Sequence, residues 1–165
     1  MSITQDRCNE LFEYIDGYLY RKITVSPNAK EGNLVGCKKD GYLVVRIDDV
    51  LHKVHRIVFL MHRGYLPDLI DHKDTNPLNN KIGNLREADK SKNSCNAKTP
   101  STNTSGIKGV SWDSVRLKWR VYVTLHGKQY HLGRYKTREE AEEVVMEARV
   151  ELHKEFANHG TGVVR

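Results

Sequence analysis

The stretch Leu69–Asn96, LIDHKDTNPLNNKIGNLREADKSKNSCN, decides how the chain is interpreted, because it is rich in amide and carboxylate side chains and poor in apolar ones. Asp71 and His72 end a short apolar run, so we expect both on a strand, pointing to opposite faces unless the strand is bent. Asn84 immediately precedes a second expected strand. Asn93 lies in a segment that can begin a helix behind an aspartate N-cap.

These residue types suit metal-assisted hydrolysis of a phosphodiester. Carboxylate and amide oxygens are hard ligands of the kind that Mg²⁺ prefers. A neutral imidazole can take a proton from an attacking water near pH 7, and a buried asparagine can hold a loop in place. Ordinary turn chemistry is the alternative, since Asp, Asn and Pro also form polar loops without any catalytic role. Composition alone leaves both interpretations open.

Two turn signals in the first third of the chain predict β-hairpins. Asp16 and the glycine after it separate LFEYID from YLYRKI, and Asp48 and the aspartate after it separate GYLVVRI from VLHKVHR. Such pairs are typical of tight turns between strands. Residues 53–64, KVHRIVFLMHRG, place apolar side chains at helical spacing and predict a helix that ends at Gly64.

The rest of the chain predicts a three-stranded sheet and a helix behind a polar linker. Residues 96–106, NAKTPSTNTSG, are rich in Ser, Thr and Asn and mark the best boundary between two parts. Thr137 and Glu140 form a capping box at the start of an amphipathic helix that we expect to reach Phe156. The strand-like segments are residues 107–113, 118–125 and 128–135.

The charge of the chain is segregated. The formal net charge is +6, with 27 Lys and Arg against 21 Asp and Glu. Residues 101–138 hold eight basic side chains and one acid, whereas residues 139–156 hold seven glutamates and two basic side chains. A local basic surface of this kind favours an anionic partner such as nucleic acid.

The strand at residues 118–125 alternates between apolar and polar side chains, so one face packs on the helix and the other is polar. A three-stranded sheet is narrow enough for a DNA major groove. A solvated sheet face is one alternative. A second is an RNA-binding protein, whose tyrosines (Tyr122, Tyr130 and Tyr135) would stack on bases.

The cysteines and the hydropathy of the chain indicate a cytoplasmic protein. Three cysteines, never in a Cys-x-x-Cys pair, favour neither a disulfide framework nor a zinc knuckle. The N-terminus lacks the apolar core of a signal peptide, and no run is long enough to span a membrane. We therefore expect no membrane partner.

The ordered elements VHRIVFLMHRG and LIDHKDTNPLNNKIGNLREADKSKN resemble the HNH homing endonucleases of the phage type over about residues 54–96. The resemblance implies that Asp71 and Asn93 bind one divalent ion per active site, Mg²⁺ or Mn²⁺. It implies that His72 is the general base and that Asn84 is the catalytic-site brace of the ββα-metal motif. His55 would support the site by packing or hydrogen bonding and not as a metal ligand, and Arg56 would contact a DNA phosphate or pair with an acid.

Residues 105–160 resemble the Apetala-two (ethylene-response-factor) DNA-binding domain of plants, which recurs in phage homing endonucleases. The resemblance implies a sheet that docks in the major groove, with Trp112 and Trp119 in the core. Ser, Thr and Gln replace several arginines of the plant domains, so base preference is not transferred. The expected DNA-binding residues, including basic neighbours of the matched positions, are Lys108, Ser111, Arg116, Lys118, Arg120, Tyr122, Thr124, Lys128, Gln129, His131 and Arg134.

Together these patterns predict an α+β protein. Residues 1–97 would form an HNH nuclease domain of ββα-metal type with a β-rich extension, residues 98–105 a linker, and residues 106–160 an Apetala-two-like domain with a three-stranded antiparallel sheet on one helix. The expected function is site-directed, homing-type hydrolysis of double-stranded DNA, by a monomer or homodimer in the cytoplasm of a phage-infected bacterium. The alternative is a catalytically inactive DNA-binding regulator.

Overall fold

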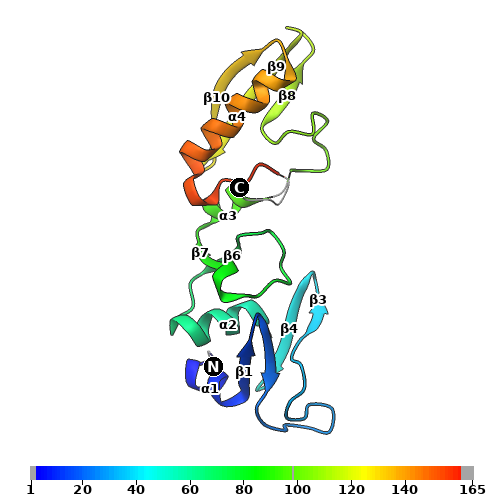
Figure 1. Ribbon diagram of the computed structural model, residues 1–165, viewed down its shortest axis with the longest axis vertical. Coiled ribbons are helices and arrows are strands. Elements are labelled where there is room, and N and C mark those ends of the chain that lie inside the picture. The colour runs from blue at the N-terminus through cyan, green and yellow to red at the C-terminus, as the bar shows by residue number, and fades with distance from the viewer. Residues whose placement is uncertain (1–2, 98, 161–165) are drawn as a thin grey trace. The chain divides into compact units, whose positions relative to one another are not determined.

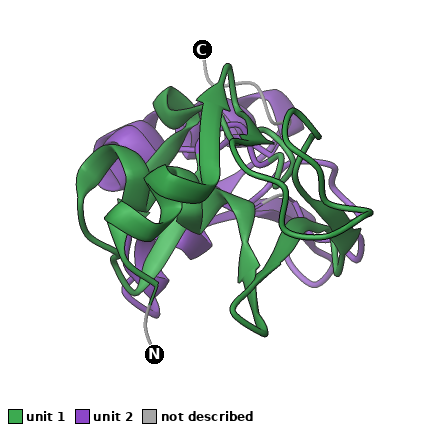
Figure 2. Ribbon diagram, turned by 90° about the horizontal axis from the view of Figure 1, so that it is seen from below, with its two compact units in different colours: residues 1–72, 76–87 green, residues 73–75, 88–165 purple. Residues whose placement is uncertain are grey.

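The computed structural model describes residues 3–97 and 99–160 and is a mixed α and β structure with small antiparallel sheets, which confirms the α+β class (Figure 1). The contacts divide the chain into two compact units, residues 1–72 with 76–87 and residues 73–75 with 88–165 (Figure 2). In chain order the elements are α1 (Gln5–Leu11), β1 (Phe12–Ile15), β2 (Tyr18–Arg21), β3 (Cys37–Lys39), β4 (Tyr42–Ile47), β5 (Val50–Lys53), α2 (Val54–Arg63), β6 (Leu69–His72), η1 (Ile82–Asn84), β7 (Leu85–Ala88), α3 (Lys90–Asn96), β8 (Val110–Asp113), β9 (Lys118–Leu125), β10 (Lys128–Tyr135), α4 (Arg138–His153) and η2 (Lys154–Phe156).

Both hairpins predicted in the first unit are present. Strands β1 and β2 pair antiparallel around Asp16, whose φ is 47°, and the glycine that follows it. Strands β4 and β5 pair antiparallel around Asp48 and Asp49, with φ of 46° and 63°. Aspartate tolerates this left-handed backbone better than most residues, which explains why aspartates mark both turns.

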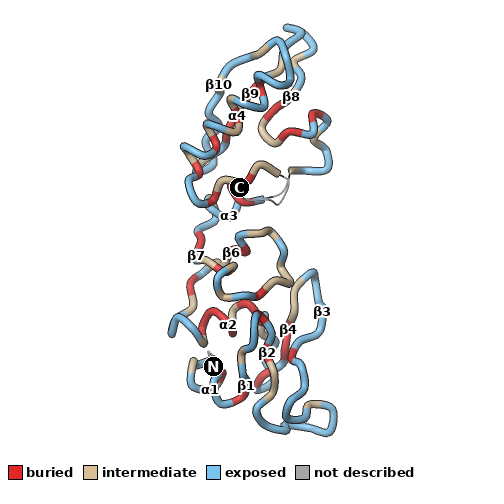
Figure 3. Tube along the Cα trace, viewed as in Figure 1, coloured by how far each residue is buried: buried red, intermediate tan, exposed pale blue. Residues whose placement is uncertain are grey.

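Helix α2 forms the centre of the first unit's core. It ends at Gly64, which has φ of 77° and donates its backbone N–H to the carbonyl of Leu60, as the sequence predicts. Val54, Ile57 and Val58 on this helix are each at most 1% exposed and belong to one apolar cluster with residues of α1, β1, β2 and β4 (Figure 3). The apolar stripe of α2 therefore holds the hairpins together.

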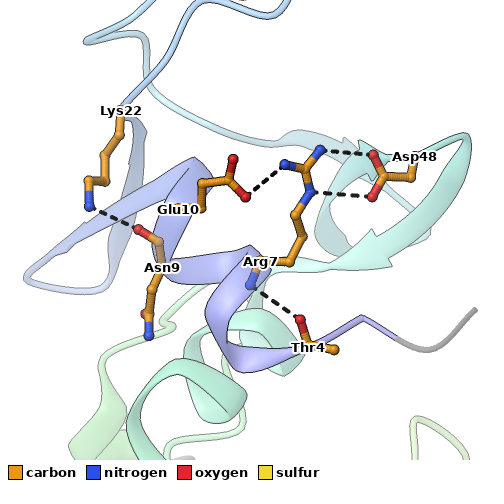
Figure 4. A network of polar contacts seen from close by, with 6 residues as sticks. All are labelled: Thr4, Arg7, Asn9, Glu10, Lys22 and Asp48. Carbon is orange, nitrogen blue, oxygen red and sulfur yellow. Dashed lines mark hydrogen bonds and ion pairs between the residues drawn. The ribbon is translucent and has the colours of Figure 1, made fainter.

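A polar network ties α1 to the turn between β4 and β5 (Figure 4). The guanidinium of Arg7 donates to both oxygens of Asp48, at 3.1 and 3.4 Å, and to Glu10 at 2.9 Å. Thr4 caps α1 by accepting the backbone N–H of Arg7 at 3.2 Å. These side chains are largely exposed, so the network fixes geometry more than it adds stability.

The second unit contains the predicted three-stranded sheet, in the order β10-β9-β8, with α4 packed against it (Figure 1). Val121 and Val123 of β9 are buried in one cluster with Ala141 and Val145 of α4. The capping box at Thr137 is present, with the Thr137 hydroxyl accepting the Glu140 backbone N–H at 3.2 Å.

Two expectations for the second unit are wrong. The long helix ends at His153, because Lys154 adopts φ of 49°, and Phe156 therefore lies in η2, in a separate apolar cluster with Ala88 and Cys95. Trp112 is not a core residue. It is 45% exposed, with its ring 5.0 Å from that of the partly buried Trp119.

The segment after β7 belongs by its contacts to the second unit. Lys108 donates its ammonium to the carbonyls of Cys95 and Ala97 at the end of α3, and Asn158 donates to the carbonyl of Asn96 at 2.7 Å. At the end of the predicted linker, the Ser105 hydroxyl lies within hydrogen-bond distance of the carbonyl oxygens of Ile107 and Val110, at 3.0 and 2.7 Å. The contacts thus divide the chain after residue 87, while the domain limits at 97 and 106 stay a prediction.

Candidate functional site

Asp71 and His72 are the last two residues of β6, which pairs with β7 in a two-stranded sheet. Both side chains are shielded from solvent, since Asp71 is 5% and His72 is 7% exposed. Burial of a carboxylate and an imidazole is costly unless each has polar partners. The polar contacts of Asp71 and His72 therefore define the geometry of the site.

Asp71 is oriented by Arg86 of β7. The Nε and Nη2 of Arg86 both donate to Oδ2 of Asp71, at 2.9 and 2.8 Å. The two side chains are only 11% and 6% exposed, so this is a buried charge pair. The sequence interpretation missed Arg86, and its place on the strand beside β6 is the signal that points to it.

His72 is oriented by Asn80. The Nε2 of His72 lies 3.1 Å from Oδ1 of Asn80, a side chain that is 1% exposed. An amide oxygen only accepts, so Nε2 carries the hydrogen and Nδ1 has the lone pair in the neutral ring. The Asn80 amide nitrogen is itself buried without a partner among the described residues. Sequence reasoning gave Asn80 no catalytic role, although it belongs to the Asn-Asn pair of the motif.

His55 packs beside His72, as the resemblance suggests. The two rings meet edge to face with centroids 5.0 Å apart, and the ring of Tyr42 lies 5.3 Å from His55. Burial lowers the pKa of His55 to about 3, and the neighbouring His72, Lys53 and Arg56 act in the same direction. His55 is therefore neutral and serves as an aromatic support.

The two remaining motif asparagines lie in different units. Asn84 ends η1 and donates its amide to the carbonyl of Asn79 at 2.9 Å, so it braces the loop that carries Asn80. Asn93 lies in α3, whose N-cap Asp89 accepts the Lys92 backbone N–H at 2.7 Å, as predicted. Because α3 belongs to the second unit, it stays a prediction that Asn93 binds the same metal ion as Asp71.

The donors of this motif suit a hard divalent cation. Among the described residues no three His, Cys, Asp or Glu side chains gather in a group that could hold a metal ion. A site built from one carboxylate, amide oxygen and water is instead the type that Mg²⁺ or Mn²⁺ accepts, because these ions keep several waters. The chemistry of the donor set thus fits the expected ion, with Arg86 on Asp71 as a competing cation.

In the second unit, strand pairing places most of the predicted DNA-binding residues on one face of the sheet. Cross-strand partners point to the same face, and the partners here are Ser111 with Arg120, Arg120 with Arg134, Tyr122 with His131, and Thr124 with Gln129. Lys118 lies two residues before Arg120 on β9, so its side chain is on the same face. Val121 and Val123, between them, face α4.

Four predicted DNA-binding residues differ from this pattern. Lys128 pairs with Leu125, so it lies on the alternate face. Arg116 lies in the turn after β8, where it and Arg134 pair with Asp113. Lys108 points at carbonyl groups of α3. Arg56 donates to the backbone carbonyl of Asp68 at 3.3 Å, and not to an acid. Their contacts with DNA stay predictions.

Comparison with known proteins identifies the motif region. Residues 52–95 match the family of HNH endonucleases. The chain is 48% identical to Protein 3.8 of Escherichia phage T7 over 97 residues, which are 58% of this chain and 75% of that protein. It is 32% identical over 122 residues, 72% of this chain, to "Uncharacterized HNH endonuclease L560" of Acanthamoeba polyphaga mimivirus, of which it spans 62%. No solved structure matches.

The chain therefore belongs to the family of phage T7 Protein 3.8, and its residues 52–95 are an HNH endonuclease domain. This match covers the whole segment from the end of β5 to α3, including each predicted active-site residue. Among the residues that the structure describes, no helix has both the length and the apolar character needed to cross a membrane.

Proposed function

We propose that this protein is a metal-dependent endonuclease of the homing type that hydrolyses phosphodiester bonds of double-stranded DNA at a directed site. The HNH domain would cleave with a single-metal ββα site. The second unit, which resembles an Apetala-two domain, would hold the enzyme on its DNA. One site cuts one strand, so a monomer would nick and a homodimer could cut both strands. The expected setting is the cytoplasm of a phage-infected bacterium.

The observation that carries the proposal is the orientation of His72. Because Asn80 accepts from Nε2, Nδ1 is the nitrogen that would take the proton of the attacking water. A base with a fixed tautomer can take the proton of an attacking water without first reorienting. Packing of the neutral His55 ring against His72 restricts the ring further.

Asp71 and Asn93 are the proposed ligands of Mg²⁺ or Mn²⁺. When bound, the ion would supply positive charge to the scissile phosphate and to the leaving 3′ oxygen. Arg86 holds one carboxylate oxygen of Asp71 in place. Asn84 fixes the loop at residues 79–84, and through it the position of Asn80.

The sheet face of the second unit is the proposed DNA-binding surface. Lys118, Arg120, Arg134 and His131 are exposed on it. Their side chains would reach phosphates and base edges in the major groove. The predicted residues Ser111, Tyr122, Thr124 and Gln129 lie between them and supply neutral hydrogen-bonding groups.

A DNA-binding regulator without nuclease activity is the second candidate, and one observation favours it. Arg86 places a guanidinium on the carboxylate that should bind the metal. A permanently bound arginine would compete with a divalent cation for Asp71. Under this alternative the protein would bind DNA without Mg²⁺-dependent cleavage.

Incubation of the full chain with phage and host DNA in Mg²⁺ or Mn²⁺, followed by mapping of nicks on both strands, separates the two candidates. We expect metal-dependent nicks that EDTA abolishes. His72→Ala should reduce the rate at least about 10³-fold and leave DNA affinity unchanged, because it removes only the proton acceptor. His52→Ala is the matched control and should cut normally. Absence of metal-dependent cutting by the wild type would favour the regulator.

A further inference from the structure

A cavity of about 470 Å³ lies within the second unit, and its lining includes none of residues 71–84. It is lined by parts of α3, the loop at residues 100–104, β8, the end of β9 and α4, all visible in Figure 1. A volume of this size is typical of sites for small ligands. Two basic side chains, Lys108 and Arg149, line it.

Two cations line this cavity without a compensating acid. Arg149 of α4 is 2% exposed and Lys108 is half-buried, and within the described residues neither forms an ion pair. Burial lowers the pKa of Lys108 to about 8 and that of Arg149 to about 10. A buried cation that lacks an anion is costly, so an anionic ligand would relieve both.

Neither cation uses all of its hydrogen-bond donors. The Arg149 guanidinium bonds the carbonyl of Lys108 and lies 3.0 Å from Nδ1 of His159, which leaves several of its five N–H groups. The Lys108 ammonium bonds the carbonyls of Cys95 and Ala97, and one of its three hydrogens remains. Within the described residues, 3–97 and 99–160, these donors have no other partner, and both side chains line the cavity.

A third side chain in the same cavity has one buried nitrogen without a partner among the described residues. His153 lines the cavity and is 7% exposed. Its Nε2 lies 3.0 Å from the carbonyl of Thr124, so Nε2 carries a hydrogen. Its Nδ1 is buried and has no hydrogen-bond partner in the described part of the chain. Buried polar atoms are rarely left unsatisfied, and such an atom points to a missing ligand or water.

We propose that this cavity binds a phosphate group, which accepts hydrogen bonds from Lys108 and Arg149 and shares a proton with His153. A phosphate has several acceptor oxygens in a tetrahedral arrangement, which suits a cavity whose lining takes donors from α4, from the residues before β8 and from the end of β9. Hydroxyl groups of Ser91, Ser94 and Thr124 also line the cavity.

The phosphate belongs either to a DNA backbone or to a free nucleotide, since both present non-bridging oxygens that accept hydrogen bonds. A nucleotide monoester can donate its own proton to Nδ1 of His153, whereas a phosphodiester has no such proton, so in a DNA complex Nδ1 would carry the shared proton itself. The site uses no residue of the proposed cleavage machinery, but Lys108 and Thr124 are among the expected DNA-binding residues. A nucleotide ligand therefore goes beyond the proposed function, whereas binding of a DNA phosphate deepens it and rests on DNA binding by the second unit. Thr124 lines the cavity and also lies on the proposed DNA face of β9, so the cavity opens beside that face.

The test is a titration of the isotope-labelled full chain with inorganic phosphate and with thymidine monophosphate, observed by the NMR signals of the histidine rings. Sodium chloride of equal ionic strength is the reference. We expect a saturable shift of the His153 ring nitrogens that chloride does not produce. If neither phosphate nor the nucleotide nor a short DNA duplex shifts the His153 ring, the proposal is wrong.

Two variants separate binding from folding. His153→Gln keeps an amide donor for the Thr124 carbonyl but lacks the second ring nitrogen, and should weaken binding about tenfold. Lys108→Met removes the ammonium and should abolish binding, provided that circular dichroism shows the native fold. His52→Gln, in the other unit, is the control and should bind normally. Wild-type affinity in both cavity variants would contradict the proposal.

A short DNA duplex distinguishes the two sources of phosphate. If the site holds the DNA backbone, His153→Gln weakens binding of the duplex by the same factor as binding of inorganic phosphate. If the site holds a nucleotide, the variant binds the duplex normally and loses affinity for thymidine monophosphate alone. Either result supports the phosphate site, and absence of nuclease activity would affect neither.

Discussion

Asn80 is the residue on which the chemistry of His72 depends. It is fully buried and its oxygen fixes which imidazole nitrogen carries the hydrogen. Because a displacement of about 1 Å in a catalytic group can cost a factor of about 100 in rate, Asn80 should matter for cleavage even though it would touch neither the metal ion nor the DNA.

We expect Asn80→Ala to lower the single-turnover cleavage rate about 100-fold, because the His72 ring loses the acceptor that orients it. The free energy of unfolding should fall by about 1–3 kcal/mol, since the Nε2–H group would be buried without a partner. Quench-flow assays and urea denaturation measure the two effects. Asn80→Asp, which keeps an acceptor oxygen, should recover much of the rate. Asn76→Ala, in an exposed part of the same loop, is the control, and equal losses in the two alanine variants would refute the assignment.

Burial of His55 makes the free energy of unfolding depend on pH. Its pKa is about 3 in the folded chain and 6.5 as the ordinary value, so the unfolded state binds more protons between these limits. The free energy of unfolding should therefore decrease as the pH falls from 6.5 toward 3, by at most about 1.4 kcal/mol per pH unit.

His55→Phe should reduce this dependence, because phenylalanine keeps a ring against His72 and Tyr42 but binds no proton. We expect the loss of stability between pH 7 and pH 5 to be smaller in the variant by up to about 2 kcal/mol. Urea denaturation at the two pH values measures the difference. His131→Phe, at an exposed position, should leave the dependence unchanged. An identical pH dependence in wild type and His55→Phe would contradict the burial of a neutral His55.

At the scale of elements, the approach of the loop before β8 to strand β9 requires a glycine. A Cβ added to Gly109, at φ of 78°, would lie 2.4 Å from the carbonyl oxygen of Tyr122. Gly127, in the turn between β9 and β10, has φ of 73°, and a Cβ there would meet nothing within 4 Å. Both positions have a similar positive φ, and they differ in the space that is available to a Cβ atom.

Gly109→Ala should therefore destabilise the second unit much more than Gly127→Ala. The turn variant should lose about 1–2 kcal/mol through left-handed backbone strain alone, and the loop variant should lose at least about 3 kcal/mol, because strand contacts must also separate. Both tryptophans, Trp112 and Trp119, lie in this unit, so their fluorescence in urea reports its unfolding. Equal losses in the two variants would show that the close approach contributes nothing.

The sequence predicted those elements whose signals are local. The turns at Asp16 and Asp48, the glycine end of α2 and the capping box at Thr137 are all present, because each depends on a few adjacent residues. Helix α4 ends earlier than its apolar spacing suggests, since Lys154 has a φ of 49°, which is not helical and which periodicity does not encode.

The less predictable features depend on contacts between distant segments. Arg86 approaches Asp71 only because β6 and β7 pair, and the grouping of α3 with the second unit depends on Lys108 and Asn158. Trp112 is 45% exposed although its residue type favours burial, whereas Trp119, its cross-strand partner, packs against the cluster that includes Ala141 and Val145 of α4. Long-range packing of this kind overrides the local pattern.

On the scale of the whole molecule, the segregated charge of the sequence becomes a division between the sheet and the helix of the second unit. The basic side chains Lys118 and Arg120 lie on the sheet face opposite α4, while the glutamates of α4 are mostly exposed. Truncation after Asn103 would remove the sheet, and it would also remove the hydrogen bonds that Lys108 and Asn158 donate to carbonyl groups of α3. Substitution on the sheet face is therefore a cleaner test of DNA binding than truncation.

The double variant Lys118→Gln with Arg120→Gln should weaken DNA binding and reduce its dependence on salt. Each lost phosphate contact lowers the slope of log K against log salt by about 0.9, so the slope should fall by about two. Fluorescence anisotropy with one duplex at several salt concentrations measures it. Lys136→Gln with Lys154→Gln removes the same charge at the two ends of α4 and should leave the slope nearly unchanged. If both double variants change the slope equally, DNA binding reflects net charge alone, and the sheet face is not the binding surface.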